Sequence, residues 1–218
     1  MKNYYLPLHP APWTGQEKNL LSFLSAERIE KIKKYHFTED QKLSFYAALL
    51  VRMALITNMQ IPNHLLQFSY DTHKKPFLLN SPECFFNFSH TRNAVLCSVS
   101  KTAPVGADIE YIKDTPFEIG DMIFHPAEKE YLLTSGSLKE KQQRFFKIWT
   151  RKEAFTKCLG TGITDNLSSI NTLSPLTESN FYTTKTEEYI LSLYSSELVS
   201  SIELISESQL INYWQNLM

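Results

Sequence analysis

Residues 145–162, FFKIWTRKEAFTKCLGTG, decide the fold of this chain. Side chains four positions apart lie on one face of a helix, so Trp149, Glu153 and Lys157 would form a stripe of an aromatic ring, a carboxylate and an ammonium group. Gly160 follows where a left-handed residue commonly ends a helix. The stretch therefore predicts the second half of a long helix with one chemically distinct face.

Taken alone, this face can be purely structural. Glu153 and Lys157 could be a surface pair of opposite charge, which stabilises a helix by only about 0.2–0.5 kcal/mol. A second stretch changes the balance, because residues 104–110, PVGADIE, follow the apolar run 94–99 and have the composition of a β-strand.

Asp108 and Glu110 lie two positions apart in this strand, so their side chains project from the same face. Carboxylates held side by side repel each other, which favours either a bound cation or solvation at an exposed sheet edge. Together with Glu153 they would form an all-oxygen metal site suited to Mg²⁺. Lys157, one helical turn beyond Glu153, would then reach phosphate oxygens that the metal also contacts, as in phosphoryl transfer.

The segments V-G-A-D-I-E at 105–110 and W-T-R-K-E-A-F-T-K at 149–157, with this separation, resemble the signature of the 4′-phosphopantetheinyl transferases. The similarity is greatest to the monomeric, double-length type that activates surfactin synthetase and similar peptide or polyketide synthases, and it covers roughly residues 18–165. The resemblance implies transfer of 4′-phosphopantetheine from coenzyme A to a serine hydroxyl of an apo acyl or peptidyl carrier protein. It also implies Mg²⁺ as cofactor and release of adenosine 3′,5′-bisphosphate.

Other segments match the family's contacts to coenzyme A. Basic residues at the places of Arg28 and Lys31 hold the 3′-phosphate in the family, and Ser44 stands where the family has a threonine. Lys74 replaces the glycine of the family's Gly-Lys-Pro turn. The resemblance assigns these residues to coenzyme A: Arg28, Lys31, Ser44, Lys75, Ser89, His90, Asp108, Glu153 and Lys157.

Two residues are expected to carry the reaction. Lys157 would stabilise charge on the pyrophosphate, and Glu153 would accept the serine proton, directly or through a metal-bound water. Glu128 belongs to a helix-opening His-Pro-Ala-Glu segment and matches an acidic site of the family. It is a second candidate base, although we favour a role in capping its own helix.

The fold class expected is α+β, with two similar halves that each pack a long helix on a small antiparallel sheet. The long helices are predicted at 39–58 and 138–159, and the active site would lie between the halves. We place the N-terminal half, with the nucleotide contacts, at 1–103 and the C-terminal half, with the metal site, at 104–218. The sheet under the second helix is predicted from four β-type runs, near 167–173, 181–184, 189–194 and 201–205.

Composition limits the other possibilities. The 218 residues are 43% hydrophobic and 21% charged, with a formal net charge of −1, which gives no overall field for nucleic acid or membranes. Cys84, Cys97 and Cys158 are widely spaced and odd in number, which argues against a disulfide framework or a zinc site and favours the reducing cytoplasm. We expect a cytoplasmic monomer without a signal peptide or membrane span.

Two alternatives of other classes stay open on the sequence. The same acidic residues and lysine would serve a Mg²⁺-dependent nuclease, although no acid-x-Lys strand motif is present and the charge is near zero. A non-catalytic module that binds coenzyme A or a carrier protein is the other, but it would have no need to keep three mutually repelling carboxylates.

Overall fold

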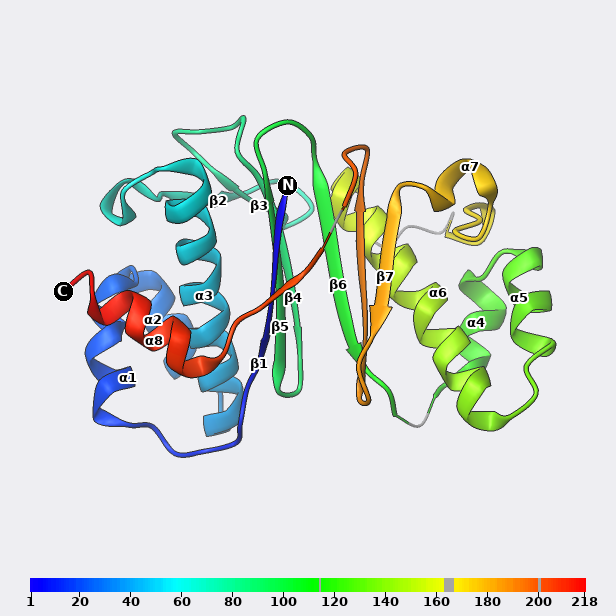
Figure 1. Cartoon of the computed structure of the whole chain (residues 1–218), viewed down its shortest axis with the longest axis horizontal. Coiled ribbons are helices and arrows are strands. Elements are labelled where there is room, and N and C mark those ends of the chain that lie inside the picture. Colours follow the sequence, from blue (N-terminus) through cyan, green and yellow to red (C-terminus); the bar gives the residue numbers. More distant parts are fainter. Residues whose placement is uncertain (114, 163–166, 200) are drawn as a thin grey trace.

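The computed structural model describes residues 1–113, 115–162, 167–199 and 201–218. Two α+β halves lie side by side, and their sheets meet in the middle with helices on both outer sides (Figure 1). The two long helices, α3 (Thr38–Met59) and α6 (Leu138–Leu159), occupy corresponding places in the two halves. The predicted fold class, including both long helices, is confirmed.

The N-terminal sheet has the strand order β4-β5-β1-β9. Its strands are β1 (Lys2–Pro7), β4 (Phe85–Thr91), β5 (Ala94–Ser100) and β9 (Glu203–Leu204), of which only β9 joins in parallel. Short strands β2 (Phe68–Tyr70) and β3 (Pro76–Leu78) form a separate hairpin. The other helices of this half are α1 (Gly15–Leu20), α2 (Ala26–Lys33) and α8 (Glu207–Gln215).

Helix α3 is buried on nearly every side, which explains why its sequence is apolar almost all round. It packs on β5 and β1, while α2 and α8 cover its outer side. The core around it includes Leu49, Leu50, Leu20 and Trp214, all fully buried.

The C-terminal sheet is antiparallel with the order β6-β8-β7. Its strands are β6 (Val105–Tyr111), β7 (Phe181–Lys185) and β8 (Tyr189–Ser195). Helix α6 packs on β6 and β8, and the outer helices are α4 (Phe117–Ile123), α5 (Pro126–Leu133) and α7 (Pro175–Glu178). Leu96 of β5 packs with Ala107, Ile109 and Leu191, so an apolar layer joins the two sheets.

Two strand predictions for the C-terminal half are wrong. Residues 167–173 were expected as a strand, but 167–169 form a turn of 3₁₀-helix, because the ammonium of Lys152 draws the carbonyls of Leu167 and Ile170 inward at 2.8 and 2.6 Å. The 201–205 run does contain a strand, yet that strand, β9, pairs with β1 of the other half.

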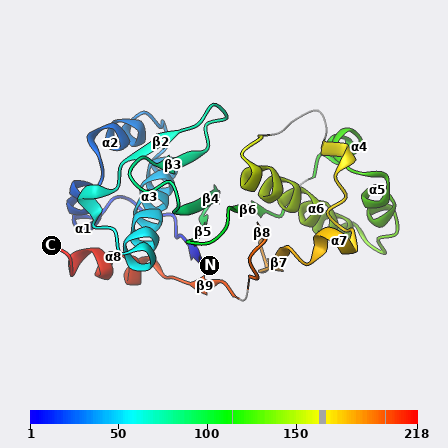
Figure 2. The same ribbon diagram turned by 90° about the horizontal axis from the view of Figure 1, so that it is seen from above.

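The end of the described chain thus returns to the N-terminal half. The backbone N–H of Ile205 donates to the carbonyl of Tyr5, and α8 then packs against α1 and α3 (Figure 2). The division at 103/104 stays a prediction. Within the described residues, no helix is both long enough and apolar enough to cross a membrane.

Gly106 of β6 fixes how closely α6 approaches the sheet. A Cβ atom at this position would lie 1.7 Å from the carbonyl oxygen of Ala154 and 2.7 Å from the backbone nitrogen of Cys158. Both are backbone atoms of α6, so the collision could be relieved only by moving the whole helix. The glycine therefore permits the helix–strand contact that brings Glu153 and Lys157 beside Asp108.

We expect Gly106→Ala to lower the free energy of unfolding by about 1–3 kcal/mol or more, because the methyl group would overpack a rigid backbone contact. Urea unfolding followed by circular dichroism measures this change. Gly15→Ala is the matched control, since a Cβ there meets nothing within 4 Å. Equal stability of the two variants would contradict the close packing.

Candidate active site

The site lies in a seam where the edge strand of each sheet runs beside the other. Three side chains of β4, two residues apart in sequence, reach across to β6: Asn87, Ser89 and Thr91. The Oδ1 of Asn87 accepts a hydrogen bond from the backbone nitrogen of Ala107 at 3.0 Å. Side chains thus join the two sheets at this point and place polar groups between them.

Asp108 is at the centre of the seam, and its side chain is almost fully buried. Its Oδ1 accepts from the hydroxyl of Ser89 at 2.9 Å and from the ammonium of Lys157 at 2.5 Å. The same ammonium lies 3.1 Å from the Ser89 hydroxyl. The other carboxylate oxygen, Oδ2, is buried and has no hydrogen-bond partner among the described residues, which is costly unless a ligand satisfies it.

Glu110 and Glu153 extend the acidic group. Glu110 accepts from the indole nitrogen of Trp149 at 3.3 Å, and burial together with the charge of Asp108 raises its pKa. Burial, followed by the charge of Asp108, raises the pKa of Glu153 to about 7, although Lys157 opposes the shift. The predicted stripe of α6 therefore does face the two acidic residues of β6.

The structure does not by itself define a metal centre. Among the described residues, no group of three or more His, Cys, Asp or Glu side chains meets the arrangement of a metal site. The ammonium of Lys157 is the cation that lies against Asp108. The unpartnered Oδ2 of Asp108 and the raised pKa values of the two glutamates nevertheless make an oxygen donor set whose repulsion a divalent cation would relieve.

Lys75 crosses the seam from the β2–β3 hairpin. Its ammonium donates to the carbonyl of Cys158 at 2.7 Å, near the C-terminal end of α6, and burial lowers its pKa. Lys74 adopts the left-handed conformation, with φ of 64°, where the family has glycine. The Asp71 carboxylate holds this turn through the backbone nitrogens of His73 and Lys75, at 2.9 and 2.8 Å. The turn therefore forms without the glycine.

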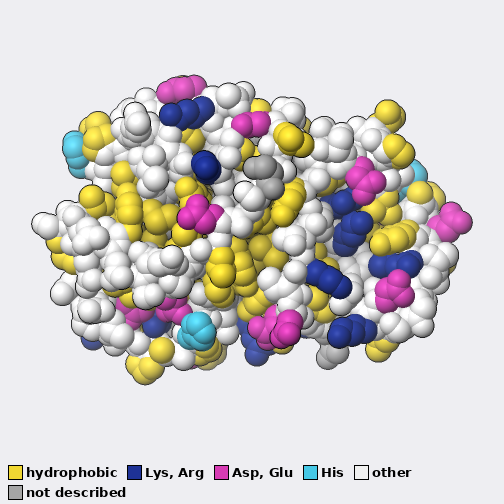
Figure 3. Space-filling model, in the orientation of Figure 1, with side chains coloured by type: hydrophobic (Ala, Val, Ile, Leu, Met, Phe, Trp, Pro, Cys, Tyr) yellow, Lys and Arg dark blue, Asp and Glu magenta, His cyan; other side chains and the backbone are white. Residues whose placement is uncertain are grey.

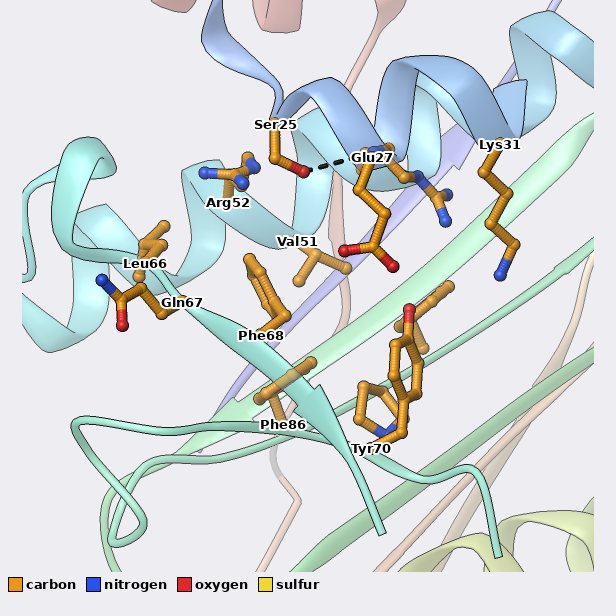
Figure 4. A pocket seen from close by; sticks show the side chains of 14 residues that line it. Ser25, Glu27, Lys31, Val51, Arg52, Leu66, Gln67, Phe68, Tyr70 and Phe86 are labelled. Carbon is orange, nitrogen blue, oxygen red and sulfur yellow. Dashed lines mark hydrogen bonds between the residues drawn. The ribbon is translucent and has the colours of Figure 1, made fainter. Parts of the chain in front are cut away.

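Beside the seam is a pocket of about 310 Å³ between α2, α3 and β2. Lys31 and Glu27 reach into it from α2 and Arg52 from α3, and Phe68 and Tyr70 of β2 line the opposite side (Figure 4). The wall is mostly aromatic and aliphatic, with cationic groups at its rim. Such a pocket suits a flat aromatic ligand that carries negative charge.

Arg28 also lines this pocket, and its guanidinium donates to the backbone carbonyl of Ser44 at 2.8 Å. Burial lowers the pKa of this guanidinium. Within the part of the chain that the structure describes, neither its Nε nor the buried hydroxyl of Ser44 has a hydrogen-bond partner. Lys31 is exposed and lies 5.9 Å from the centre of the Tyr70 ring.

His90 of β4 lies close enough to both Arg28 and Lys157 for their charges to act on its ring. Burial lowers the pKa of this ring, as do the positive charges of Arg28 and Lys157, although the residue as a whole is exposed to solvent. The structure thus places Arg28 and Lys31 in the pocket and groups Ser89, Asp108 and Lys157 in the seam. It does not test their individual roles.

Glu128 lies outside both the pocket and the seam. It is fully buried, pairs with the ammonium of Lys152 at 2.9 Å and accepts from both the backbone nitrogen and the hydroxyl of Thr172. It also accepts from the backbone nitrogen of His125, which confirms the capping role. Both carboxylate oxygens of Glu128 are engaged in these hydrogen bonds and in the ion pair, so Glu128 is not available as a base.

Sequence reasoning missed several contributors. Asn87 stands two residues before Ser89 in the same strand, so the alternation of side chains could have indicated that it faces β6. Thr91, whose hydroxyl lies 3.4 Å from Glu110, continues the same alternation. Arg52 and Phe86 of the pocket gave no such signal, because single basic residues in apolar helices and aromatic residues in strands also occur far from any binding pocket.

Comparisons with known proteins place this chain in one family. Residues 104–209 match the 4′-phosphopantetheinyl transferase superfamily, and residues 11–102 match the family described as 4′-phosphopantetheinyl transferase, N-terminal. The chain belongs to the 4′-phosphopantetheinyl transferase family and is an enzyme of that class.

Three curated relatives illustrate the similarity. The chain is 31% identical over 159 residues to 4′-phosphopantetheinyl transferase Sfp of Bacillus subtilis, which covers 72% of this chain and 70% of that protein. It is 33% identical to 4′-phosphopantetheinyl transferase gsp of Aneurinibacillus migulanus, over 67% of this chain and 62% of the relative. It is 31% identical to HetI of Nostoc, over 68% and 65%. These matches favour the transferase over the nuclease and the non-catalytic module.

The raised pKa of Glu153 has a consequence for stability. Between pH 4.5 and about 7 the folded protein holds a proton that the unfolded chain releases, so stability should fall as pH rises through this window. Glu153→Gln removes the loss. As pH rises from 5 to 8, we expect the free energy of unfolding of the variant to increase relative to that of the wild type by on the order of 1–3 kcal/mol. Urea unfolding without added metal measures this difference.

Glu187→Gln, at an exposed turn, is the control and should follow the wild type at both pH values. If the Glu153→Gln curve also stays parallel to the wild type, the carboxyl does not titrate near neutral pH.

Proposed function

We propose that this enzyme transfers 4′-phosphopantetheine from coenzyme A to a serine hydroxyl of an apo acyl or peptidyl carrier protein and releases adenosine 3′,5′-bisphosphate. The observation that carries the proposal is the succession of cationic groups from the pocket to the seam: Arg28 lines the pocket, its charge and that of Lys157 both act on His90, and Lys157 pairs with Asp108. In a chain of this family, that order suits a ligand with a nucleotide at one end and a pyrophosphate in the middle.

The nucleotide end would lie in the pocket. Phe68 and Tyr70 offer flat apolar surface to the base, and Arg28 and Lys31 offer positive charge to the 3′-phosphate. Ser44 would act through its carbonyl, which positions the Arg28 guanidinium. Replacing the family's lysine by arginine at position 28 keeps the charge and adds a planar fork of donors.

The pyrophosphate would lie along the seam. Lys75, His90 and Ser89 flank it, and Lys157 would leave Asp108 to stabilise the charge that develops as the phosphorus–oxygen bond breaks. Asp108, Glu110 and Glu153 would hold Mg²⁺ with their carboxylate oxygens. When bound, the ion would neutralise the pyrophosphate and polarise the bond that is cleaved.

Glu153 is the proposed base for the serine proton. In the metal-free protein, burial and the charge of Asp108 raise the pKa of Glu153 to about 7, so this carboxylate is a stronger base than that of an ordinary glutamate. The serine would approach this oxygen along the seam between β4 and β6. A base acting through a water molecule is compatible with the same position.

We further propose that the enzyme is a monomer in the reducing cytoplasm and has no nucleic-acid partner. The three cysteines are free, and two of them, Cys97 and Cys158, are buried. The net charge of −1 offers no general attraction for a polyanion.

Intact-mass spectrometry tests the reaction. The wild type with coenzyme A, Mg²⁺ and an apo carrier protein should add one phosphopantetheine group to the carrier, and EDTA should prevent this. Asp108→Asn should abolish the transfer. As a readout independent of activity, Mg²⁺ should raise the melting temperature of the wild type but not that of the variant. Full activity of Asp108→Asn would overturn the metal assignment.

Arg28→Ala should separate binding from chemistry. Because the guanidinium would contact only the nucleotide end, we expect KM for coenzyme A to rise about tenfold or more with kcat nearly unchanged. Lys157→Ala should instead lower kcat more than it weakens coenzyme A binding. An unchanged KM in the first variant would remove Arg28 from the nucleotide site.

A further inference from the structure

A second cationic surface lies on the side of α6 opposite to the Trp149–Glu153–Lys157 stripe. Four basic residues line a groove there, and we call it the basic groove: Arg144, Lys147 and Arg151 of α6 and Lys185 of β7. The groove encloses about 470 Å³. Positive side chains gather beside β7 on this face of the molecule (Figure 3).

Only two of the four basic residues of the groove pair with carboxylates of the described residues. Glu140 pairs with Arg144 at 2.6 Å and Glu178 with Arg151 at 3.4 Å, which leaves Lys147 and Lys185 without a carboxylate partner among the described residues. Burial lowers the pKa of Lys147, and the charges of Arg151 and Arg144 lower it further, although Glu178 opposes them. A bound anion would relieve this crowding.

One wall of the groove is the free edge of a sheet. Strand β7 is the outermost strand of β6-β8-β7, so among the described residues no strand pairs with its other side. Its groove-lining residues are Thr183, Thr184 and Lys185. An unpaired edge is a ready template for an added strand.

The hydrogen-bond alternation shows which backbone groups point outward. The N–H of Thr186 donates to the carbonyl of Tyr189, and the N–H of Ser195 donates to that of Asn180. In an antiparallel ladder such bonded pairs alternate with non-bonded ones. Phe181, Thr183 and Lys185 therefore direct their backbone N–H and C=O groups away from β8, toward the free edge of the sheet.

These observations point to a peptide rather than a small anion. A free phosphate would use the cations but not the row of outward backbone groups. We propose that the basic groove binds an extended acidic segment of a partner protein, which adds as a strand beside β7 while its carboxylates meet Lys147 and Lys185. This inference does not depend on the transfer reaction.

The probe is a fluorescein-labelled peptide of alternating threonine and glutamate, measured by fluorescence anisotropy at low salt. We expect it to bind the wild-type protein, and a threonine–lysine peptide not to bind. The double variant Lys147→Glu with Lys185→Glu should weaken binding at least about tenfold, because two attractive contacts become repulsive. Lys18→Glu with Lys33→Glu, which changes the same charge at exposed positions of α1 and α2, should bind as the wild type does.

Two further measurements isolate the site and the binding mode. Saturating coenzyme A should leave the peptide affinity unchanged, because the basic groove and the seam lie on opposite faces of α6. Competition between coenzyme A and the peptide would place the peptide in the coenzyme A site and overturn the proposal. Methylating the backbone nitrogens of either the odd or the even residues should abolish binding for one of the two peptides, since only one set faces β7. Equal binding of both methylated peptides would overturn strand addition.

Thermal unfolding must show that the Lys147 and Lys185 double variant is folded. Should it not fold, Lys185→Glu alone replaces it, because this side chain is exposed at the sheet edge. Unchanged peptide affinity in the folded variant would overturn the groove as the binding site.

Discussion

The contact between α6 and β6 at Gly106 controls the geometry of the site. The backbone of Ala154 lies where any side chain at position 106 would have to be, and this fixes the separation of helix and strand. At that separation, the side chains four residues apart on α6 face the side chains two residues apart on β6. The ammonium of Lys157 then lies 2.5 Å from the carboxylate of Asp108. A wider spacing would keep both elements intact but would separate the acids from the lysine.

The same contact places the carboxyl groups of Asp108, Glu110 and Glu153 close together in a largely buried position, where they repel one another. One buried oxygen of Asp108 finds no hydrogen-bond partner in residues 1–113, 115–162, 167–199 and 201–218, and Glu110 and Glu153 hold their protons more tightly than ordinary glutamates do. An apolar layer joins the two sheets beside the seam, and Glu128 and Lys152 neutralise each other in the interior of the C-terminal half. Buried carboxyl groups with shifted pKa values are common at sites that bind charged ligands.

Local sequence pattern was sufficient for the long helices and for the acidic strand, because their periods and boundary residues are strong local signals. It was also sufficient to group Asp108, Glu153 and Lys157. Local pattern was not sufficient where a segment contacts residues far away in the sequence. The ammonium of Lys152 binds a carbonyl of the 167–173 segment, and β9 pairs with β1 of the other half. Lys74 shows a third limit, since the Asp71 carboxylate supports a left-handed residue that a glycine rule would have excluded.

The return of β9 and α8 to the first half bears on the order in which the chain can fold during synthesis. Trp214 is fully buried in the N-terminal core, with its ring 4.7 Å from that of Phe23. A ribosome would therefore have to translate the whole second half before the first could close its core. Until then, the nascent N-terminal half would expose the apolar surface that α8 later covers, and chaperones that recognise such surfaces would have their longest opportunity to bind there.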